Sequence, residues 1–317
     1  MRLPPHPLAA AVLALVVAVL AACGEDGGRA SGTGGELTVA ATTTQVADLA
    51  RNVAGDRAEV RGLLRPEADP HDYEPRPSDA EAIAEAGVVL ASGGDLDEWL
   101  DDLVQSTGGE TPVVRLIDRV RTIPGAEEEA DPHWWHDPRN AVAAVGVIRD
   151  ALVRADPGGR VVYERNARAY AARLRALDRD VAACLRRVPA GQRKLVTTHD
   201  ALAYFAERYG IEAIGSVLDS LSTQAQPSAG DTSELVRQMR AQDVRVLFAE
   251  SSVAPRLERA IAREAGARVG AALYADTLGP EGSSGDTYVR SVAANADAMV
   301  RGFTAGRERC TPSAAQR

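Results

Sequence analysis

Short apolar runs alternate with segments whose apolar residues recur every three or four positions along residues 37–303. The short runs predict buried strands, and the three- and four-residue spacing predicts amphipathic helices. The predicted strands are residues 37–41, 58–63, 88–91 and 112–116 in the first half, and 194–198, 212–217, 244–249 and 268–272 in the second. The predicted helices are residues 45–54, 79–86, 96–105, 201–209, 232–241, 255–265 and 286–303. Strand followed by helix, repeated in this way, indicates parallel sheets with right-handed crossovers.

Residues 137–188 differ from both halves because they show helical periodicity and no strand signal, with one break at Asp156-Pro157-Gly158-Gly159. After the break an apolar stripe continues for roughly 28 residues, which at about 1.5 Å per residue predicts a helix about 40 Å long. We therefore expect an α/β fold of two lobes, residues 37–136 and 189–305, each a parallel sheet flanked by helices. A long rigid helix joins them, and residues 306–317 form a tail. Lobe motions should be small, because bending a helix breaks its hydrogen bonds.

The N-terminus carries a secretory signal of the lipoprotein kind. A positive start at Arg2 precedes an apolar run over residues 8–20, which ends in Leu20-Ala21-Ala22-Cys23. We interpret residues 1–22 as a signal peptide, Cys23 as the lipidated N-terminus and residues 23–36 as a flexible tether. A retained transmembrane helix is the weaker alternative, because the apolar run is short. The folded part is therefore expected outside the cytoplasm, anchored to the cell membrane at the cell surface or in the periplasm.

Composition and charge limit the kinds of molecule that the protein can bind. The formal net charge is -9 and no basic run is present, which argues against a nucleic-acid surface, since phosphate binding needs clustered Lys and Arg. We expect a monomer. Besides Cys23, the chain contains Cys184 and Cys310, which could form one disulfide in an oxidising compartment, although sequence does not show that they come within reach.

Four of the five histidines lie in three short segments, and the fifth, His6, belongs to the signal peptide. His71 lies in a loop with four prolines, which fix the backbone on both sides of it. Ser78 and Glu81 after this loop predict a capping box at the next helix. Taken alone, the loop is equally compatible with a surface turn that carries a solvated histidine.

The other candidates follow predicted strands or turns. His133 and His136 are three residues apart, and either could reach a metal ion, while the two tryptophans between them more often indicate packing. His199 ends a buried strand where a helix starts, the position at which ligands bind to parallel sheets. Asp276 follows the last strand, where a lone aspartate is usually a turn or cap residue.

These segments resemble the solute-binding lipoproteins of zinc and manganese ABC transporters (cluster A-I), and the likeness covers residues 37–303. The resemblance lies in Asp69-Pro70-His71-Asp72-Tyr73-Glu74-Pro75, in Asp131-Pro132-His133-Trp134-Trp135-His136-Asp137-Pro138, and in Thr287-Tyr288 followed by Asn295. It implies that His71 and His133 from the N-terminal lobe and His199 and Asp276 from the C-terminal lobe bind one metal ion. The family usually has an aliphatic residue at the position of His136, so an auxiliary ligand remains open there. The histidine-rich loop of many zinc importers is replaced by a short acidic stretch.

The resemblance also implies the metal and the partners. Members that resemble manganese carriers have a carboxylate at the position of His199, whereas those that resemble zinc carriers have histidine. Three imidazoles and one carboxylate suit tetrahedral Zn²⁺, while Mn²⁺ prefers more oxygen ligands. We therefore expect zinc, with Mn²⁺ as the alternative, delivered to an ABC permease and its ATPase. Asp72, Asp200 and His136 are candidate partners of the ligands.

Two other functions remain open at this point. A binding protein for a metal chelate or another small solute could share the lobed fold but would bind no bare ion. A secreted zinc hydrolase could use the same residues, but four ligands would fill the tetrahedron, and no H-E-x-x-H motif is present. We therefore expect a binding protein and not an enzyme.

Overall fold

The computed structural model describes Met1 and residues 37–125 and 129–316. Apart from Met1, the predicted signal peptide, Cys23 and the tether lie outside the described residues. Within the described part of the chain, no helix is both long enough and apolar enough to cross a membrane. Residues from Glu36 onward form one compact unit, so the arrangement below refers to this unit alone.

The first half contains a four-stranded parallel sheet with the order β2-β1-β3-β4. Its strands are β1 (Leu37–Ala41), β2 (Ala58–Gly62), β3 (Val88–Ala91) and β4 (Val113–Arg115), and its helices are α2 (Thr44–Ala54), α3 (Pro77–Glu85) and α4 (Trp99–Ser106). Alternate strand residues point to opposite faces. Val39 and Leu90 pack in the core that contains α2, whereas Ala40 and Val89 pack with residues of α3 and α4. Both faces of this sheet are therefore covered.

Helix α3 begins one residue earlier than the predicted cap. Pro77 is its first residue, a position where the missing N–H of proline costs nothing, and Arg76 is the N-cap. The carboxylate of Asp79 accepts the amide of Arg76 at 2.7 Å. The prediction of Ser78 as N-cap with Glu81 was therefore wrong, because Pro77 sets the start of the helix.

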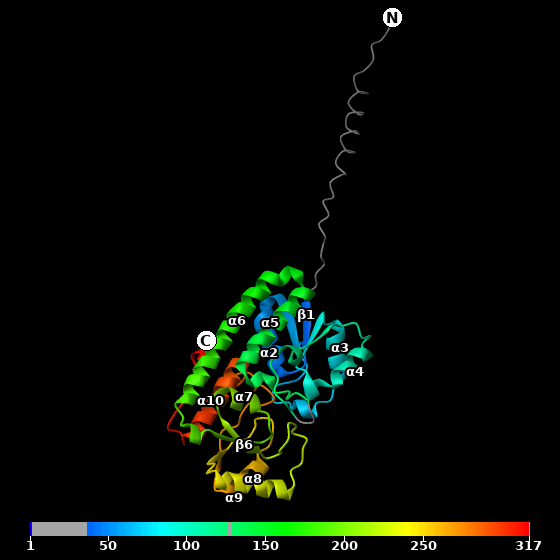
Figure 1. Cartoon of the computed structure of the whole chain (residues 1–317). Coiled ribbons are helices and arrows are strands. Elements are labelled where there is room, and N and C mark those ends of the chain that lie inside the picture. Colours follow the sequence, from blue (N-terminus) through cyan, green and yellow to red (C-terminus); the bar gives the residue numbers. More distant parts are fainter. Residues whose placement is uncertain (2–36, 126–128, 317) are drawn as a thin grey trace. The chain divides into compact units, whose positions relative to one another are not determined.

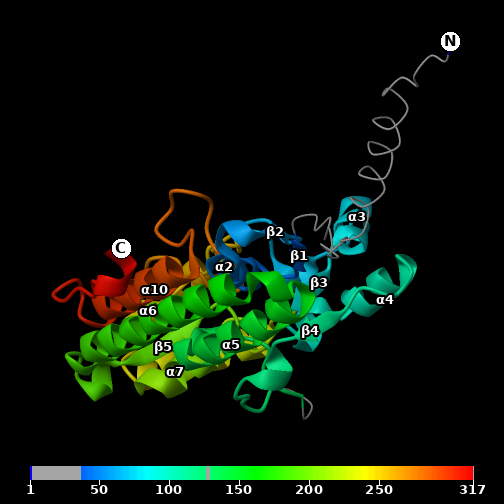
Figure 2. The same ribbon diagram turned by 90° about the horizontal axis from the view of Figure 1, so that it is seen from above.

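Two helices connect the halves. They are α5 (Pro138–Ala155) and α6 (Arg160–Arg186), and they run side by side (Figures 1 and 2). The chain turns between them at the predicted break, where the carboxylate of Asp156 accepts the hydroxyl of Tyr163 at 2.8 Å. The predicted apolar stripe of α6 is buried from Tyr163 onward, including Leu174, Leu177 and Val181, whereas Val161 in the first turn is exposed. The 27 residues of α6 span about 40 Å at about 1.5 Å per residue.

The second half repeats the scheme with shorter strands. It contains β5 (Lys194–Thr197) paired with β6 (Glu212–Ser216), β7 (Val246–Leu247) paired with β8 (Arg268–Val269), and helices α7 (Ala203–Tyr209), α8 (Ala229–Ala241), α9 (Arg256–Ala265) and α10 (Tyr288–Phe303). The amide of Phe248 donates to the carbonyl of Val196, which links β7 to β5. β7 and β8 are shorter than predicted, because their ladder is interrupted after Leu247 and Val269, and the two segments pair again at the isolated bridge between Glu250 and Leu273.

One hydrophobic core extends through both halves. It includes residues of β1, α2, α5, α6, α7 and α10. A disulfide joins Cys184 at the end of α6 to Cys310, with their Cα atoms 5.4 Å apart, and the carboxylate of Asp180 accepts the amide of Ser313 at 2.8 Å. The predicted α/β class, with parallel sheets, flanking helices and a long connecting helix, is confirmed. The boundaries of the two lobes remain a prediction.

Candidate metal site

His71 lies in a short turn of 3-10 helix, η2 (Pro70–Asp72). The carboxylate of Asp69 accepts the amide of His71 at 3.0 Å, and its other oxygen accepts the hydroxyl of Thr223 at 2.7 Å. The carbonyl of His71 accepts the side-chain amide of Gln224 at 3.3 Å. The proline-rich loop is thus held to a segment of the second half by protein contacts alone.

His133 lies in a turn of the same kind, just before η5 (Trp134–His136). Asp131 accepts both the backbone amide of His133, at 2.9 Å, and its ring nitrogen Nδ1, at 2.8 Å. The backbone bond repeats the one between Asp69 and His71. The ring bond does not, and it fixes the orientation of the imidazole of His133.

His199 follows the carboxyl end of β5, where parallel sheets place their ligands. Glu250, after the end of β7, accepts the amide of His199 at 3.0 Å and its Nδ1 at 2.8 Å. The hydroxyl of Thr197 donates to the carbonyl of His199 at 2.7 Å. The backbone and the ring of His199 are therefore both fixed.

Asp276 is fully buried and brings the three rings together. Its Oδ2 lies 3.6 Å from Nε2 of His71 and 3.2 Å from Nε2 of His199, and its Oδ1 lies 3.4 Å from Nε2 of His133. One ligand atom from each of the four residues lies within 4.8 Å of all the others. Zn²⁺ with four ligands at about 2.1 Å would place neighbouring ligand atoms about 3.4 Å apart. The three carboxylate-to-ring distances, 3.2–3.6 Å, are close to this value.

The atoms that face the centre are also free to bind an ion. Nε2 of each ring and both oxygens of Asp276 are buried and have no hydrogen-bond partner among the described residues. Buried polar atoms are normally satisfied, because leaving one without a partner costs about 1–3 kcal/mol. A divalent cation at the centre would satisfy all four side chains at once.

Burial and neighbouring charges shift the pKa values of the three histidines. Burial lowers the pKa of His71 to about 4. Burial also disfavours a charge on His133, but the carboxylates of Asp131 and Asp276 outweigh it and raise its pKa to about 9. The same balance, with Asp276 and Glu250, raises the pKa of His199 well above its ordinary value.

The three other candidates lie outside this cluster. His136 is buried, its ring 5.7 Å from that of Trp135, and burial lowers its pKa to about 3. It is not part of the group of four. Asp72 and Asp200 are exposed, and the carboxylates bonded to the histidine rings are those of Asp131 and Glu250 instead. Sequence reasoning missed both of these partners.

The two tryptophans are buried and have structural partners. The indole of Trp134 donates to the carbonyl of Ser92 at 3.3 Å, and the indole of Trp135 donates to the carbonyl of Ala275 at 3.1 Å. The ring of Trp135 lies 5.5 Å from that of His133. Trp135 therefore contacts one metal candidate and supports the residue that precedes another.

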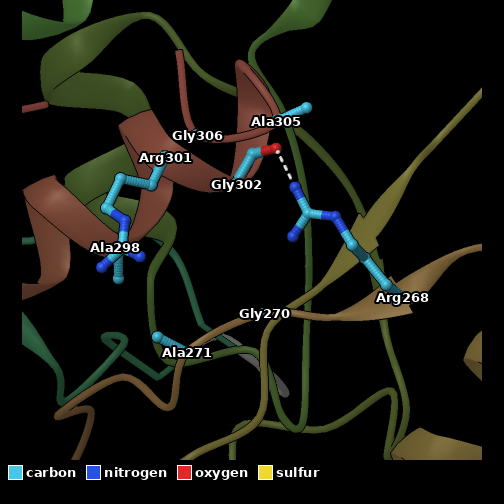
Figure 3. Close-up of a pocket in the computed structure, with 8 residues that line it drawn as sticks. All are labelled: Arg268, Gly270, Ala271, Ala298, Arg301, Gly302, Ala305 and Gly306. Atoms are coloured by element: carbon cyan, nitrogen blue, oxygen red, sulfur yellow. Dashed lines mark hydrogen bonds between the residues drawn. The ribbon is translucent and has the colours of Figure 1, made fainter. Parts of the chain in front are cut away.

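A hollow at the end of α10 lies apart from this cluster (Figure 3). Its lining includes Arg268, Arg301 and several small residues, and Arg268 donates to the carbonyl of Gly302 at 2.9 Å. Cations near the last carbonyls of a helix neutralise its negative end. We therefore interpret these arginines as helix-end partners.

Residues 39–302 match the ZnuA family, described as zinc-uptake complex component A, periplasmic. The chain belongs to this family. It is 31% identical to the manganese-binding lipoprotein MntA of Halalkalibacterium halodurans, across 92% of this chain and 97% of that protein. It is 32% identical to the iron-binding protein YfeA of Yersinia pestis, across 86% and 88%. The structure of the periplasmic zinc binding protein TroA from Treponema pallidum superposes with a TM-score of 0.80 at 29% identity, covering 85% of this chain and 99% of that one.

The predicted resemblance is therefore confirmed. The chain is an extracytoplasmic metal-binding protein that serves an ABC transporter as its substrate-binding component. The family consists of solute-binding proteins, so the hydrolase alternative is excluded. The names of the relatives cover manganese, iron and zinc, and they leave the metal of this chain open.

Proposed function

We propose that this protein captures one Zn²⁺ ion between its halves and delivers it to the permease and ATPase of an ABC importer. The ligands would be Nε2 of His71, His133 and His199 and a carboxylate oxygen of Asp276. The observation that carries the proposal is the convergence of these four buried side chains, each with an unpartnered atom toward one centre.

The donor set favours zinc over manganese. Three imidazoles and one carboxylate match the nitrogen-rich tetrahedral sites of Zn²⁺, whereas Mn²⁺ prefers more oxygen ligands and a higher coordination number. The carboxylates of Asp131 and Glu250 do not face the centre, because each bonds the outer nitrogen of a ring. They strengthen the rings as ligands and add no oxygen to the site.

Manganese is the second candidate. The relatives named MntA support it, and both oxygens of Asp276 are without hydrogen bonds, so the carboxylate can supply two oxygens. Competition between Zn²⁺ and Mn²⁺ for the site distinguishes the two candidate functions.

The membrane anchor is part of the proposal. Relatives of this chain are named lipoproteins, and the sequence Leu20-Ala21-Ala22-Cys23 fits lipidation at Cys23. The lipid would keep the protein beside its permease, and we propose that it acts there as a monomer. Replacement of Cys23 by Ser should release the protein from the membrane fraction, and retention of this variant would exclude the lipid anchor.

Calorimetry on the chain from Gly24 onward tests metal capture. We expect one tight Zn²⁺ site that Mn²⁺ does not displace, and at least tenfold weaker zinc binding in His71→Ala and His199→Ala. Glu207→Gln, which changes an exposed carboxylate of α7 away from the cluster, is the matched control and should bind as the unchanged chain does. Tighter binding of Mn²⁺ would replace zinc by manganese, and no binding of any bare ion would favour a metal chelate or another solute.

A further inference from the structure

Asp276 differs from the histidines in how it is held. The rings of His133 and His199 are each fixed by a carboxylate. Apart from the histidine rings of the site itself, neither oxygen of Asp276 has a hydrogen-bond donor in the part of the chain that the structure describes. Its orientation must therefore come from the backbone on either side of it.

The residue before Asp276 is held by the first half of the chain. The carbonyl of Ala275 accepts the indole N–H of Trp135 at 3.1 Å, and the side-chain amide of Gln45 lies 3.5 Å from it. Trp135 and Gln45 are both buried. These donors fix the plane of the peptide bond that leads into Asp276.

The residue after Asp276 is held in the same way. The hydroxyl of Thr277 accepts the amide of Glu67, in the loop of His71, at 3.0 Å and lies 3.4 Å from the hydroxyl of Thr44. The amide of Leu278 donates to that hydroxyl of Thr44 at 2.9 Å. Thr277 is fully buried and Thr44 nearly so. The contacts between Thr44, Thr277 and Leu278 are buried, whereas the bond from Glu67 is partly buried.

We propose that this set of contacts, the Asp276 bracket, positions the carboxylate for the metal, with Trp135, Thr44 and Thr277 as its positioning residues. The bracket consists of Thr44, Gln45, Glu67, Trp135 and Thr277. The inference rests on the proposed function. The second half supplies the carboxylate and the first half orients it, so separating the two segments would remove these contacts and move Asp276 away from the imidazoles of His71 and His133. Breaking the bracket is therefore a route to metal release.

Two substitutions at Thr277 separate its hydroxyl from its shape. Thr277→Val keeps the volume and removes the hydroxyl, whereas Thr277→Ser keeps the hydroxyl. In the full chain, purified in detergent, we expect Thr277→Val to weaken zinc binding about tenfold, mainly through faster release to a chelator. Thr277→Ser should bind and release zinc as the unchanged protein does. Thr304→Val removes another buried hydroxyl, bonded within α10 at 2.7 Å, and should leave zinc binding unchanged.

Cobalt provides a readout that a general loss of stability does not change. The visible absorption of bound Co²⁺ depends on its ligand geometry, so Thr277→Val should alter the spectrum and Thr304→Val should not. Trp135→Phe, which keeps an aromatic ring and removes the indole N–H, gives a second test if Thr277→Val does not fold. If the unchanged protein binds no metal, the proposed function fails. If it binds zinc but Thr277→Val or Trp135→Phe binds equally well, or Thr277→Ser is as weak as Thr277→Val, the bracket is overturned.

Discussion

A histidine ring has two nitrogens, and it binds a metal ion through the one that is not bonded to another group. In His133 and His199 that group is a carboxylate on Nδ1 at 2.8 Å, so the proton stays on Nδ1 and Nε2 faces the ion. The carboxylate also makes the ring a better electron donor. The four ligands alone therefore do not determine the affinity.

Glu250→Gln tests this contribution. The substitution keeps the size and an oxygen that can accept the amide of His199, but it removes the negative charge beside Nδ1. We expect zinc affinity to fall between about tenfold and a hundredfold, measured by calorimetry. Glu207→Gln, on the exposed surface of α7, is the matched control. Equal affinity in Glu250→Gln would show that the charge of the carboxylate does not tune the ring.

Zinc should displace protons when it binds. The raised pKa values of His133, about 9, and of His199 favour a second proton, on Nε2, on each ring of the metal-free protein at neutral pH. Metal needs neutral rings, so binding releases these protons, and affinity rises as the pH increases toward about 9. Calorimetry in two buffers with different ionisation enthalpies measures the release. The same binding enthalpy in both buffers would contradict the raised pKa values.

The four residues that converge are those that the family resemblance implied. The residue pattern alone left a solvated His71, a choice between His133 and His136, and a turn role for Asp276 open. It did not place the carboxylates that bond the rings. Asp131, two residues before His133 in the same Asp-Pro-His order as Asp69 and His71, had a local signal. Glu250 is 51 residues from His199 in sequence, and only the folding of the sheet brings them together. Asp72 and Asp200 were predicted as partners because each directly follows a histidine in sequence, but both are exposed in the structure.

At the scale of elements, hydrophobic periodicity predicted every strand and helix of the two halves to within a few residues. The largest differences are β7 and β8, which have two residues each. Hydrophobic periodicity indicates which residues are buried, and Phe248 and Ala249 are buried as expected. It does not indicate pairing: the ladder between β7 and β8 is interrupted after Leu247, and the two segments pair again at Glu250 and Leu273. The sequence therefore does not predict where a strand ends within a run of buried residues.

The disulfide between α6 and the C-terminal segment should stabilise the fold without affecting the site. It closes a loop of 126 residues, and loss of a native disulfide typically costs about 2–5 kcal/mol. The double substitution Cys184→Ser, Cys310→Ser should lower the free energy of unfolding in urea by an amount in that range. Zinc affinity should stay unchanged, because neither cysteine belongs to the cluster. A matching loss of affinity would show that the end of α6 supports the site directly.

At the scale of the whole folded unit, residues 37–316, the two halves share one apolar core, through which α6 runs. Separating them widely would expose side chains such as Leu174, Leu177 and Val292. Exposure of one such side chain costs about 1.5–3 kcal/mol, whereas a nanomolar ion contributes about 12 kcal/mol. Exposing about four to eight of them would use all of the binding free energy. The free energy of metal binding is therefore too small to balance the cost of a wide opening of this core.

Metal removal should instead act locally. Each neutral hydrogen bond of the Asp276 bracket contributes about 0.5–1.5 kcal/mol net, so the loops around His71 and Asp276 can loosen at much lower cost than the core. We expect the radius of gyration from X-ray scattering to be the same with and without zinc. Amide hydrogen exchange should quicken in residues 65–73 and 275–278 on metal removal, while the amides of α6 stay protected. A clear increase in the radius of gyration, or faster exchange along α6, would instead mean that the connecting helices bend and the halves separate when the ion leaves.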